Sequence, residues 1–290
     1  MGELGVLGLG MMGGAMARRL LATGEQVAGF DLASERRREL AGAGLTAVDS
    51  TTELARRCEI VLVSVATGEQ LLAAVDDLVA GERERLLVVD ASTVDPETSA
   101  SARSRLEAAG GSLLCAPVSG SSGLAESGGL TAFCSGSEED YGRAAPLLDA
   151  IAAKATLVGP AEEARVVKLI VNLVVIGTME LVAESLALGE AFGIGRRAAL
   201  GLLRESVIGS PFLDYKAEAL AAADYSPTAS LGLVRKDLGL IRRVAAERGV
   251  ELPATAVVDA TYARGEELGF RDSDFASVVE VLVKRGEVVL

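Results

Sequence analysis

The feature that most constrains the fold is a cluster of glycines near the start of the chain, GLGMMG at residues 8–13. It follows a short apolar segment, residues 4–8, and opens a segment in which Met16 and Leu20 recur at helical spacing. Glycines in the pattern GxGxxG allow a tight turn, leave room for a pyrophosphate and let a helix pack closely on a strand. The stretch therefore predicts a strand, a dinucleotide-binding turn and a helix.

Strand-like segments recur through the first half of the chain, several of them separated by charged helical segments. The later ones are QVAGFD from Gln26, IVLVSV from Ile60, LLVVD from Leu86, SLLCAPV from Ser112 and LTAFCSG from Leu130. Alternation of this kind is typical of a mostly parallel sheet covered on both faces. We expect an α/β, Rossmann-type domain over residues 1–160.

The strand pattern stops after Pro160. Residues 161–195 begin with two glutamates and end with glycines, which predicts one helix of about thirty residues. Its apolar stretch LIVNLVVIGTM, residues 169–179, is too short to span a bilayer and is predicted to be buried. The remainder has short breaks at GSPF, DYSP and GVELP. Residues 161–290 are therefore predicted to form a long inter-domain helix and an all-α C-terminal domain.

Composition excludes several kinds of chemistry. The chain has no histidine, which excludes Ser/His/Asp triads, histidine-ligated zinc and a histidine base. Proton transfer must fall to Lys, Asp, Glu, Tyr, Cys or water, and we expect no metal.

Charge and cysteine content bound the partners and the compartment. The net charge of −13 does not suit nucleic acid, and we expect no membrane partner. Three cysteines without paired spacing, and an N-terminus unlike a signal peptide, favour a cytoplasmic protein.

Asp31, at the end of the second strand segment, suits the acidic position that binds an adenosine ribose. Its carboxylate can accept from both ribose hydroxyls and repel a 2′-phosphate, which favours NAD over NADP. Arg36, Arg37 and Arg38 are close enough in sequence to compete for such a phosphate, so NADP stays possible. The alternative is a structural turn followed by a surface aspartate.

Two further stretches carry candidate chemistry. CAPVSGSSGLAESGGL, from Cys115, leaves backbone amides unshielded as a nest for a carboxylate, unless it is only a flexible loop. In ARVVKLIVN, Lys168 and Asn172 are four residues apart and share one helix face. Apolar neighbours and a positively charged nicotinamide would lower the pKa of this lysine and make it a usable base. Without that context, the alternative is a helix-face lysine whose amine extends to water.

Together these motifs resemble the β-hydroxyacid dehydrogenase family, which includes 3-hydroxyisobutyrate dehydrogenase, tartronate semialdehyde reductase and the L-threonate dehydrogenases. The resemblance covers nearly the whole chain. It rests on VLGLGMMGGAMARRL, APVSG, KLIVN and the late VRKDLGLI, which stand in the family's order.

The resemblance implies a role for each matching position. Lys168 would be the catalytic acid/base, and Asn172 would position it or the substrate hydroxyl. Ser119, Gly120 and Ser121 would hold the substrate carboxylate. The cofactor would be bound by Gly8, Leu9, Gly10, Met11, Met12, Gly13, Asp31, Thr93 and Lys236, the last reaching back from the helical domain.

The implied activity is NAD(P)-dependent hydride transfer at the β-carbon of a small 3-hydroxy acid, by a homodimer or homotetramer. Cys115, Ser121 and Ala229 depart from the family's usual residues, which leaves the identity of the acid open. The alternatives are an imine reductase on the same fold, a phosphogluconate-type decarboxylating dehydrogenase and a catalytically silent nucleotide-binding module.

Overall fold

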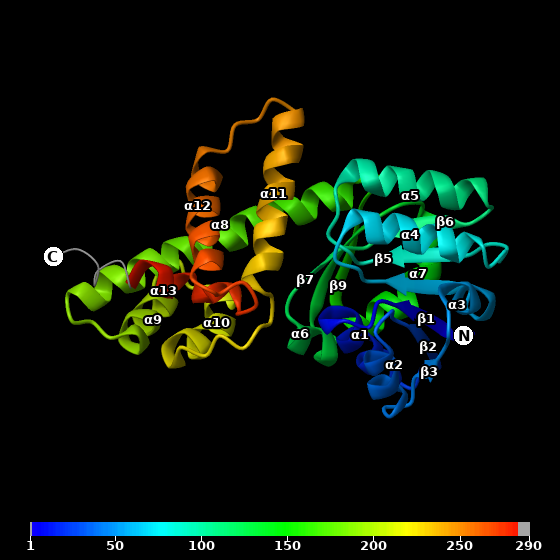
Figure 1. Cartoon of the computed structure of the whole chain (residues 1–290), viewed down its shortest axis with the longest axis horizontal. Coiled ribbons are helices and arrows are strands. Elements are labelled where there is room, and N and C mark those ends of the chain that lie inside the picture. Colours follow the sequence, from blue (N-terminus) through cyan, green and yellow to red (C-terminus); the bar gives the residue numbers. More distant parts are fainter. Residues whose placement is uncertain (1, 284–290) are drawn as a thin grey trace. The chain divides into compact units, whose positions relative to one another are not determined.

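A computed structural model describes residues 2–283 and divides after Lys168 into two compact units (Figure 1). The division falls inside a long helix, α8 (Glu163–Ala191), so this one helix belongs to both units. The first unit is α/β, and the second is helical over its described residues.

The first unit is built on a sheet whose six leading strands run parallel. In space their order is β3-β2-β1-β4-β5-β6. The strands are β1 (Leu4–Leu7), β2 (Val27–Phe30), β3 (Thr46–Ala47), β4 (Ile60–Val63), β5 (Leu87–Asp90) and β6 (Ser112–Cys115). This is the order of a dinucleotide-binding Rossmann fold, and it confirms the predicted fold class.

Three further strands extend the sheet beyond β6. β7 (Val118–Ser119) and β8 (Leu130–Ser135) pair antiparallel, and β9 (Ala152–Gly159) runs parallel to β8. β9 and the two-residue β3 are additional to the predicted strands. The β9 sequence, AAKATLVG, is largely half-buried or exposed and lacks the continuous apolar run that marked the others.

Helices cover both faces of this sheet. They are α1 (Met11–Ala22), α2 (Ser34–Ala41), α3 (Thr51–Arg57), α4 (Gly68–Val79), α5 (Pro96–Ala108), α6 (Ser122–Ser127) and α7 (Glu138–Ile151). Buried side chains of α1, α6 and α7 form one core with the sheet, and those of α3, α4 and α5 form a second core on the other face. Figure 1 shows α4 and α5 running side by side along that second face. The predicted double covering is confirmed.

The long helix is confirmed, but its predicted burial is only partly correct. Leu169, Ile176 and Met179 are buried, whereas Ile170 and Val174 are 56% and 63% exposed. When apolar residues lie on every side of a helix, the sequence does not indicate which side faces the core. By length and composition alone α8 also qualifies as a membrane-spanning helix, with 33% of its most apolar window buried.

The second unit packs its helices around α8. They are α9 (Arg196–Glu205), α10 (Pro211–Ala222), α11 (Leu231–Glu247), α12 (Pro253–Glu267), the 3₁₀ turn η1 (Phe275–Ser277) and α13 (Val278–Val283). The predicted breaks GSPF, DYSP and GVELP all fall at helix boundaries. A single apolar core joins α8 to the other helices of this unit.

Candidate dinucleotide and substrate site

The glycine turn between β1 and α1 brings backbone closer than any side chain would allow. Gly8 has a φ of +86°, and a Cβ there would lie 2.2 Å from the Ser64 carbonyl oxygen. A Cβ on Gly13 would lie 1.8 Å from the Gly8 carbonyl oxygen. Gly8 is therefore required for the turn and Gly13 for the packing of α1 on β1.

This turn lies where a dinucleotide binds in folds of this type. β1 has β2 on one side and β4 on the other, so the chain reverses its direction across the sheet there. Gly10 is the N-cap of α1 and makes no side-chain cap, and the first turn of α1 carries no acidic residue. The helix thus presents free N–H groups and the positive end of its dipole, which fits the pyrophosphate of NAD(P).

Asp31 follows β2 and is bound to the glycine turn. One carboxylate oxygen accepts from the Leu9 N–H at 2.8 Å, and the other accepts from the Ala33 N–H at 2.8 Å. The Arg36 guanidinium lies 3.4 Å from this carboxylate. The same guanidinium is next to Gly10. The acidic side chain therefore stands beside the glycine turn, with a cation next to it.

The other two arginines of this segment have partners outside that carboxylate. Arg37 donates to the backbone carbonyl of Asp31 and lies over the Phe30 ring, 5.1 Å from its centroid. Arg38 donates to the Ser34 carbonyl within α2. Of the three arginines, Arg36 is the one whose charge faces Asp31.

The segment after β5 is tied to the end of β4. Ser92 donates its N–H to Asp90 at 3.0 Å, and its hydroxyl accepts from the Val65 N–H at 2.9 Å. Thr93, the next residue, is half-buried and is therefore held at the carboxyl edge of the sheet.

The predicted carboxylate-binding residues Ser119, Gly120 and Ser121 lie from the end of β7 to the N-cap of α6. Gly120 has a φ of +136°, and a Cβ there would meet the Leu130 side chain at 2.8 Å. The Ser121 hydroxyl accepts from the Leu124 N–H and caps α6. The hydroxyl is an acceptor in this cap and still has its own hydrogen with which to donate.

Cys115, the last residue of β6, lies in a buried polar network. Its thiol is 3.1 Å from the Ser99 hydroxyl and 3.2 Å from the Glu162 carboxylate. Arg103 pairs with Glu162 at 2.9 Å and also reaches the thiol. Burial raises the pKa of Cys115, which keeps it a neutral thiol.

Lys168 is half-buried near the start of α8. Arg165, one turn before it, is fully buried and pairs with Asp90 at 2.6 Å. Sequence reasoning missed Arg165; the one available signal was a guanidinium inside the apolar run ARVVKLIV. The turn that carries Lys168 is thereby attached to the carboxyl end of β5.

Asn172 lies one turn further along α8 and belongs to the second unit. Its side-chain amide donates to the Asp237 carboxylate at 2.9 Å, and Lys236 forms an ion pair with the same carboxylate at 3.0 Å. Asp237 is 7% exposed. The motifs KLIVN and KDLGLI, distant in sequence, therefore meet through these three side chains.

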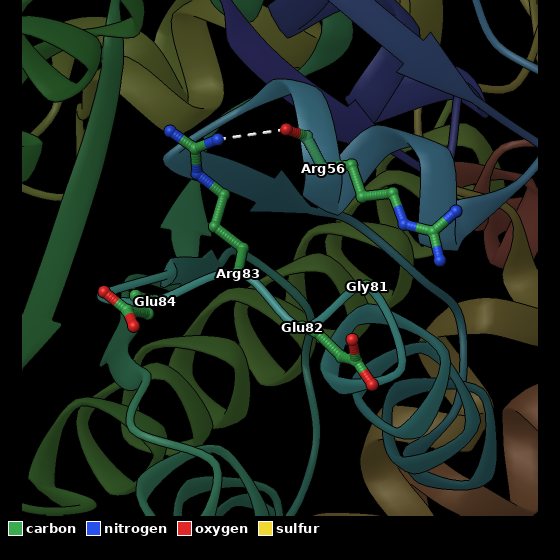
Figure 2. Close-up of a pocket in the computed structure, with 5 residues that line it drawn as sticks. All are labelled: Arg56, Gly81, Glu82, Arg83 and Glu84. Carbon is green, nitrogen blue, oxygen red and sulfur yellow. Dashed lines mark hydrogen bonds between the residues drawn. The ribbon is translucent and has the colours of Figure 1, made fainter.

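A surface hollow of about 360 Å³ lies at the opposite edge of the sheet. Figure 2 shows it lined by Arg56 of α3 and by the connection from α4 to β5, with Arg83 donating to the Arg56 carbonyl at 3.0 Å. That connection precedes the amino end of β5, whereas the glycine turn lies at the carboxyl ends of the strands. The hollow is therefore not the predicted nucleotide site.

Comparisons with known proteins agree with this arrangement. Residues 3–159 match the NAD binding domain of 6-phosphogluconate dehydrogenase, and residues 163–282 match the NAD-binding domain of NADP-dependent 3-hydroxyisobutyrate dehydrogenase. The chain belongs to the β-hydroxyacid dehydrogenase family. This family membership makes it an NAD(P)-binding oxidoreductase.

Relatives span the whole length of the chain. An L-threonate dehydrogenase of Cupriavidus necator is 30% identical, over 96% of this chain and 95% of its own. Glyoxylate/succinic semialdehyde reductase 1 of Arabidopsis thaliana is 28% identical, over 97% and 98%. The solved 3-hydroxyisobutyrate dehydrogenase of Mycobacterium tuberculosis, with L-serine, has a TM-score of 0.86 at 27% identity, over 97% and 99%.

The imine reductases are more distant. The Streptomyces aurantiacus enzyme has a TM-score of 0.68 at 22% identity, over 97% of this chain and 99% of its own. That likeness extends to the fold alone.

The contact of Gly13 with Gly8 leads to a prediction about cofactor binding. The Cβ of a Gly13→Ala variant would overlap the Gly8 carbonyl oxygen and push α1 off β1. We expect NADH to bind at least about tenfold more weakly, as measured by fluorescence titration. Gly142→Ala is the matched control, because nothing lies within 4 Å of a Cβ at that position in α7. Unchanged NADH affinity in folded Gly13→Ala would contradict this account.

Proposed function

We propose that the chain is a dehydrogenase of small 3-hydroxy acids in which Lys168 is the general acid/base. The supporting observation is the attachment of the Lys168 turn, through Arg165, to Asp90 and to the Ser92 carbonyl. Ser92 adjoins Thr93, which the family resemblance assigns to the nicotinamide side of the site. A proton-transfer group and the cofactor segment would thus share one rigid support.

A bound nicotinamide would supply the hydride chemistry, in either direction, at the carbinol carbon β to the carboxylate. Lys168 would take the hydroxyl proton in oxidation and give it back in reduction. Backbone N–H groups of Ser119, Gly120 and Ser121 would hold the carboxylate. Alignment of the carbinol carbon would supply most of the rate enhancement.

Two residues of the second unit complete the proposal. Asn172 would position Lys168 or the substrate hydroxyl, and Lys236 would reach the cofactor. Both side chains contact Asp237, so a displacement of Asn172 would also displace Lys236. This shared contact supports a common role.

The first test is replacement of the proposed acid/base. We expect Lys168→Met to lower kcat by about 100- to 10,000-fold, the usual contribution of general acid–base catalysis, and to leave NADH affinity unchanged. Lys154→Met, at an exposed position of β9, is the matched control and should retain full activity. Turnover should be followed as reduced nicotinamide absorbance, over a panel of 3-hydroxy acids with NAD and with NADP.

The acid/base assignment, the imine reductase and the silent module each have their own outcome in that assay. Full turnover by Lys168→Met would remove the acid/base assignment. Reduction of a cyclic imine, with no activity on any hydroxy acid, would favour an imine reductase. Tight NADH binding by the wild type with no turnover of either class would favour a silent nucleotide-binding module.

We further propose that NAD is preferred over NADP. The Asp31 carboxylate, held by the Leu9 N–H beside the glycine turn, would accept from the adenosine ribose and repel a 2′-phosphate. Arg36 is balanced by that carboxylate at 3.4 Å, so its charge is not free to select a phosphate.

Removal of the Asp31 charge should therefore shift coenzyme choice. We expect Asp31→Asn to lower the NAD to NADP ratio of kcat/KM by about tenfold, because Arg36 would then be released to a 2′-phosphate. Asp49→Asn, at an exposed position, is the matched control. A wild-type enzyme that prefers NADP would overturn the proposal directly.

An apolar stripe on α8 supports the proposed homodimer or homotetramer. Ile170, Val174, Leu181 and Leu188 are each 56–64% exposed and lie four or seven residues apart, on one side of the helix. Part of the stripe lines a groove of about 440 Å³ that α8 shares with α9 and α10. A second copy of the chain would cover this surface by the same patch on both partners.

The buried free cysteines Cys58, Cys115 and Cys134 agree with the proposed cytoplasmic location.

A charge within the stripe should dissociate the oligomer. We expect Leu181→Glu to lower the molar mass measured by light scattering, because the carboxylate would be buried without a partner. Val257→Glu changes an equally exposed apolar residue of α12 and should leave the mass unchanged. A monomeric wild-type protein would contradict the proposal.

A further inference from the structure

Arg165 is a charged side chain buried inside the first unit. It lies in the first turn of α8, and its side chain is 0% exposed. Burial lowers the pKa of its guanidinium, but the Asp90 and Glu162 carboxylates raise it, and the net shift is upward. The group therefore carries a full charge inside the protein.

The guanidinium is held by groups from separate segments. Its Nη2 donates to the Asp90 carboxylate at 2.6 Å, and its Nη1 donates to the Ser92 carbonyl at 2.8 Å and the Asp90 carbonyl at 3.3 Å. Its Nε donates to the Ser99 hydroxyl of α5 at 3.0 Å. The start of α8 is thus bonded to the end of β5, to the following loop and to α5.

This attachment extends to a second strand end. The second oxygen of Asp90 accepts from the Ser92 N–H, and the Ser92 hydroxyl accepts from the Val65 N–H beyond β4. The carboxyl ends of β4 and β5 and the first turn of α8 are therefore parts of one hydrogen-bonded unit.

Stability alone does not explain such a device. A buried ion pair costs several kcal/mol of desolvation for each ion, and well-packed apolar residues often do as well or better. What a planar guanidinium fork supplies instead is direction, since its donors fix both distance and angle. The pair is thus better suited to fixing a position than to adding stability.

We infer that Arg165 is a positioning residue for Lys168. Three residues on a helix correspond to an advance of roughly 4.5 Å on neighbouring faces, so holding Arg165 fixes the depth and rotation of the turn that carries Lys168. The same guanidinium holds the backbone that leads into Thr93. The lysine and the nicotinamide-side loop would therefore keep one spacing through the reaction. This inference rests on the proposed role of Lys168.

The test compares a conservative variant with a matched control. Arg165→Lys keeps a cation for Asp90 but loses the fork, and a displacement of about 1 Å can cost on the order of 100-fold in rate. We expect kcat to fall about 30- to 100-fold, with KM and NADH affinity within about threefold of wild type. Arg143→Lys alters a fork that pairs with Glu59 and Asp140 and reaches the Arg85 carbonyl, away from the predicted site. It should leave kcat unchanged.

Two readouts separate positioning from general damage. The rate should be expressed per NADH-binding site, so that a misfolded fraction does not count. With substrate deuterated at the carbinol carbon, the isotope effect on kcat should rise, and the pH profile of kcat should shift, because proton transfer by Lys168 is impaired. A merely structural role would lower the melting temperature and leave both unchanged.

Two further variants test the positioning role of Arg165. Ser99→Ala removes the bond to Nε, together with the Ser99 contacts to Cys115 and Glu162, and leaves the Arg165–Asp90 pair in place. It should lower kcat severalfold in the same direction even where Arg165→Lys does not fold. Arg165→Met should be more impaired than Arg165→Lys. Wild-type kcat in folded Arg165→Lys, or in Ser99→Ala, would overturn the inference. Lys168→Met reports separately: if it retains turnover, the acid/base proposal is wrong, whatever the Arg165 variants do.

Discussion

The structure of the first unit depends on the contact between Gly13 and the Gly8 carbonyl, where α1 packs on β1 with no side chain between them. This close approach lets α1 bury Met16 and Leu20 against the sheet and directs the start of the helix to the carboxyl edge. The same absence of side chains leaves backbone N–H groups open to an anion. Packing of the core and the capacity to bind a dinucleotide therefore have one cause.

A second constraint joins α8 to that sheet. Arg165 is buried with Asp90, and around them the Arg103 and Glu162 pair and the Cys115 thiol form a continuous polar network. Burial raises the pKa of Glu162, but hydrogen bonds from Ser99 and Arg103 lower it, and the net shift is downward. The carboxylate thus stays charged and balances the cations. The network anchors the turn that carries Lys168 to the strand ends that flank the predicted nicotinamide site.

Much of the fold was predictable because its signals are local. A few neighbouring residues are enough to predict the glycine turn, each of the six apolar strand segments and the long helix after Pro160. β9 was not predicted, since its side chains are half-exposed and make no apolar run. The exposed side of α8 was not predicted either, because apolar residues surround that helix and periodicity then carries no direction.

The sequence by itself determined the family, the fold class and the candidate residues. Glycine spacing, apolar periodicity and the order of four motifs are properties of the linear sequence and need no tertiary structure. Only the tertiary structure revealed that Arg165 meets Ser99 and Asp90, which lie 66 and 75 positions away. It alone showed Asn172 bound to Asp237, and Asp31 bound to the glycine turn. Contacts between distant segments depend on how the sheet and helices pack, and no local pattern encodes that packing.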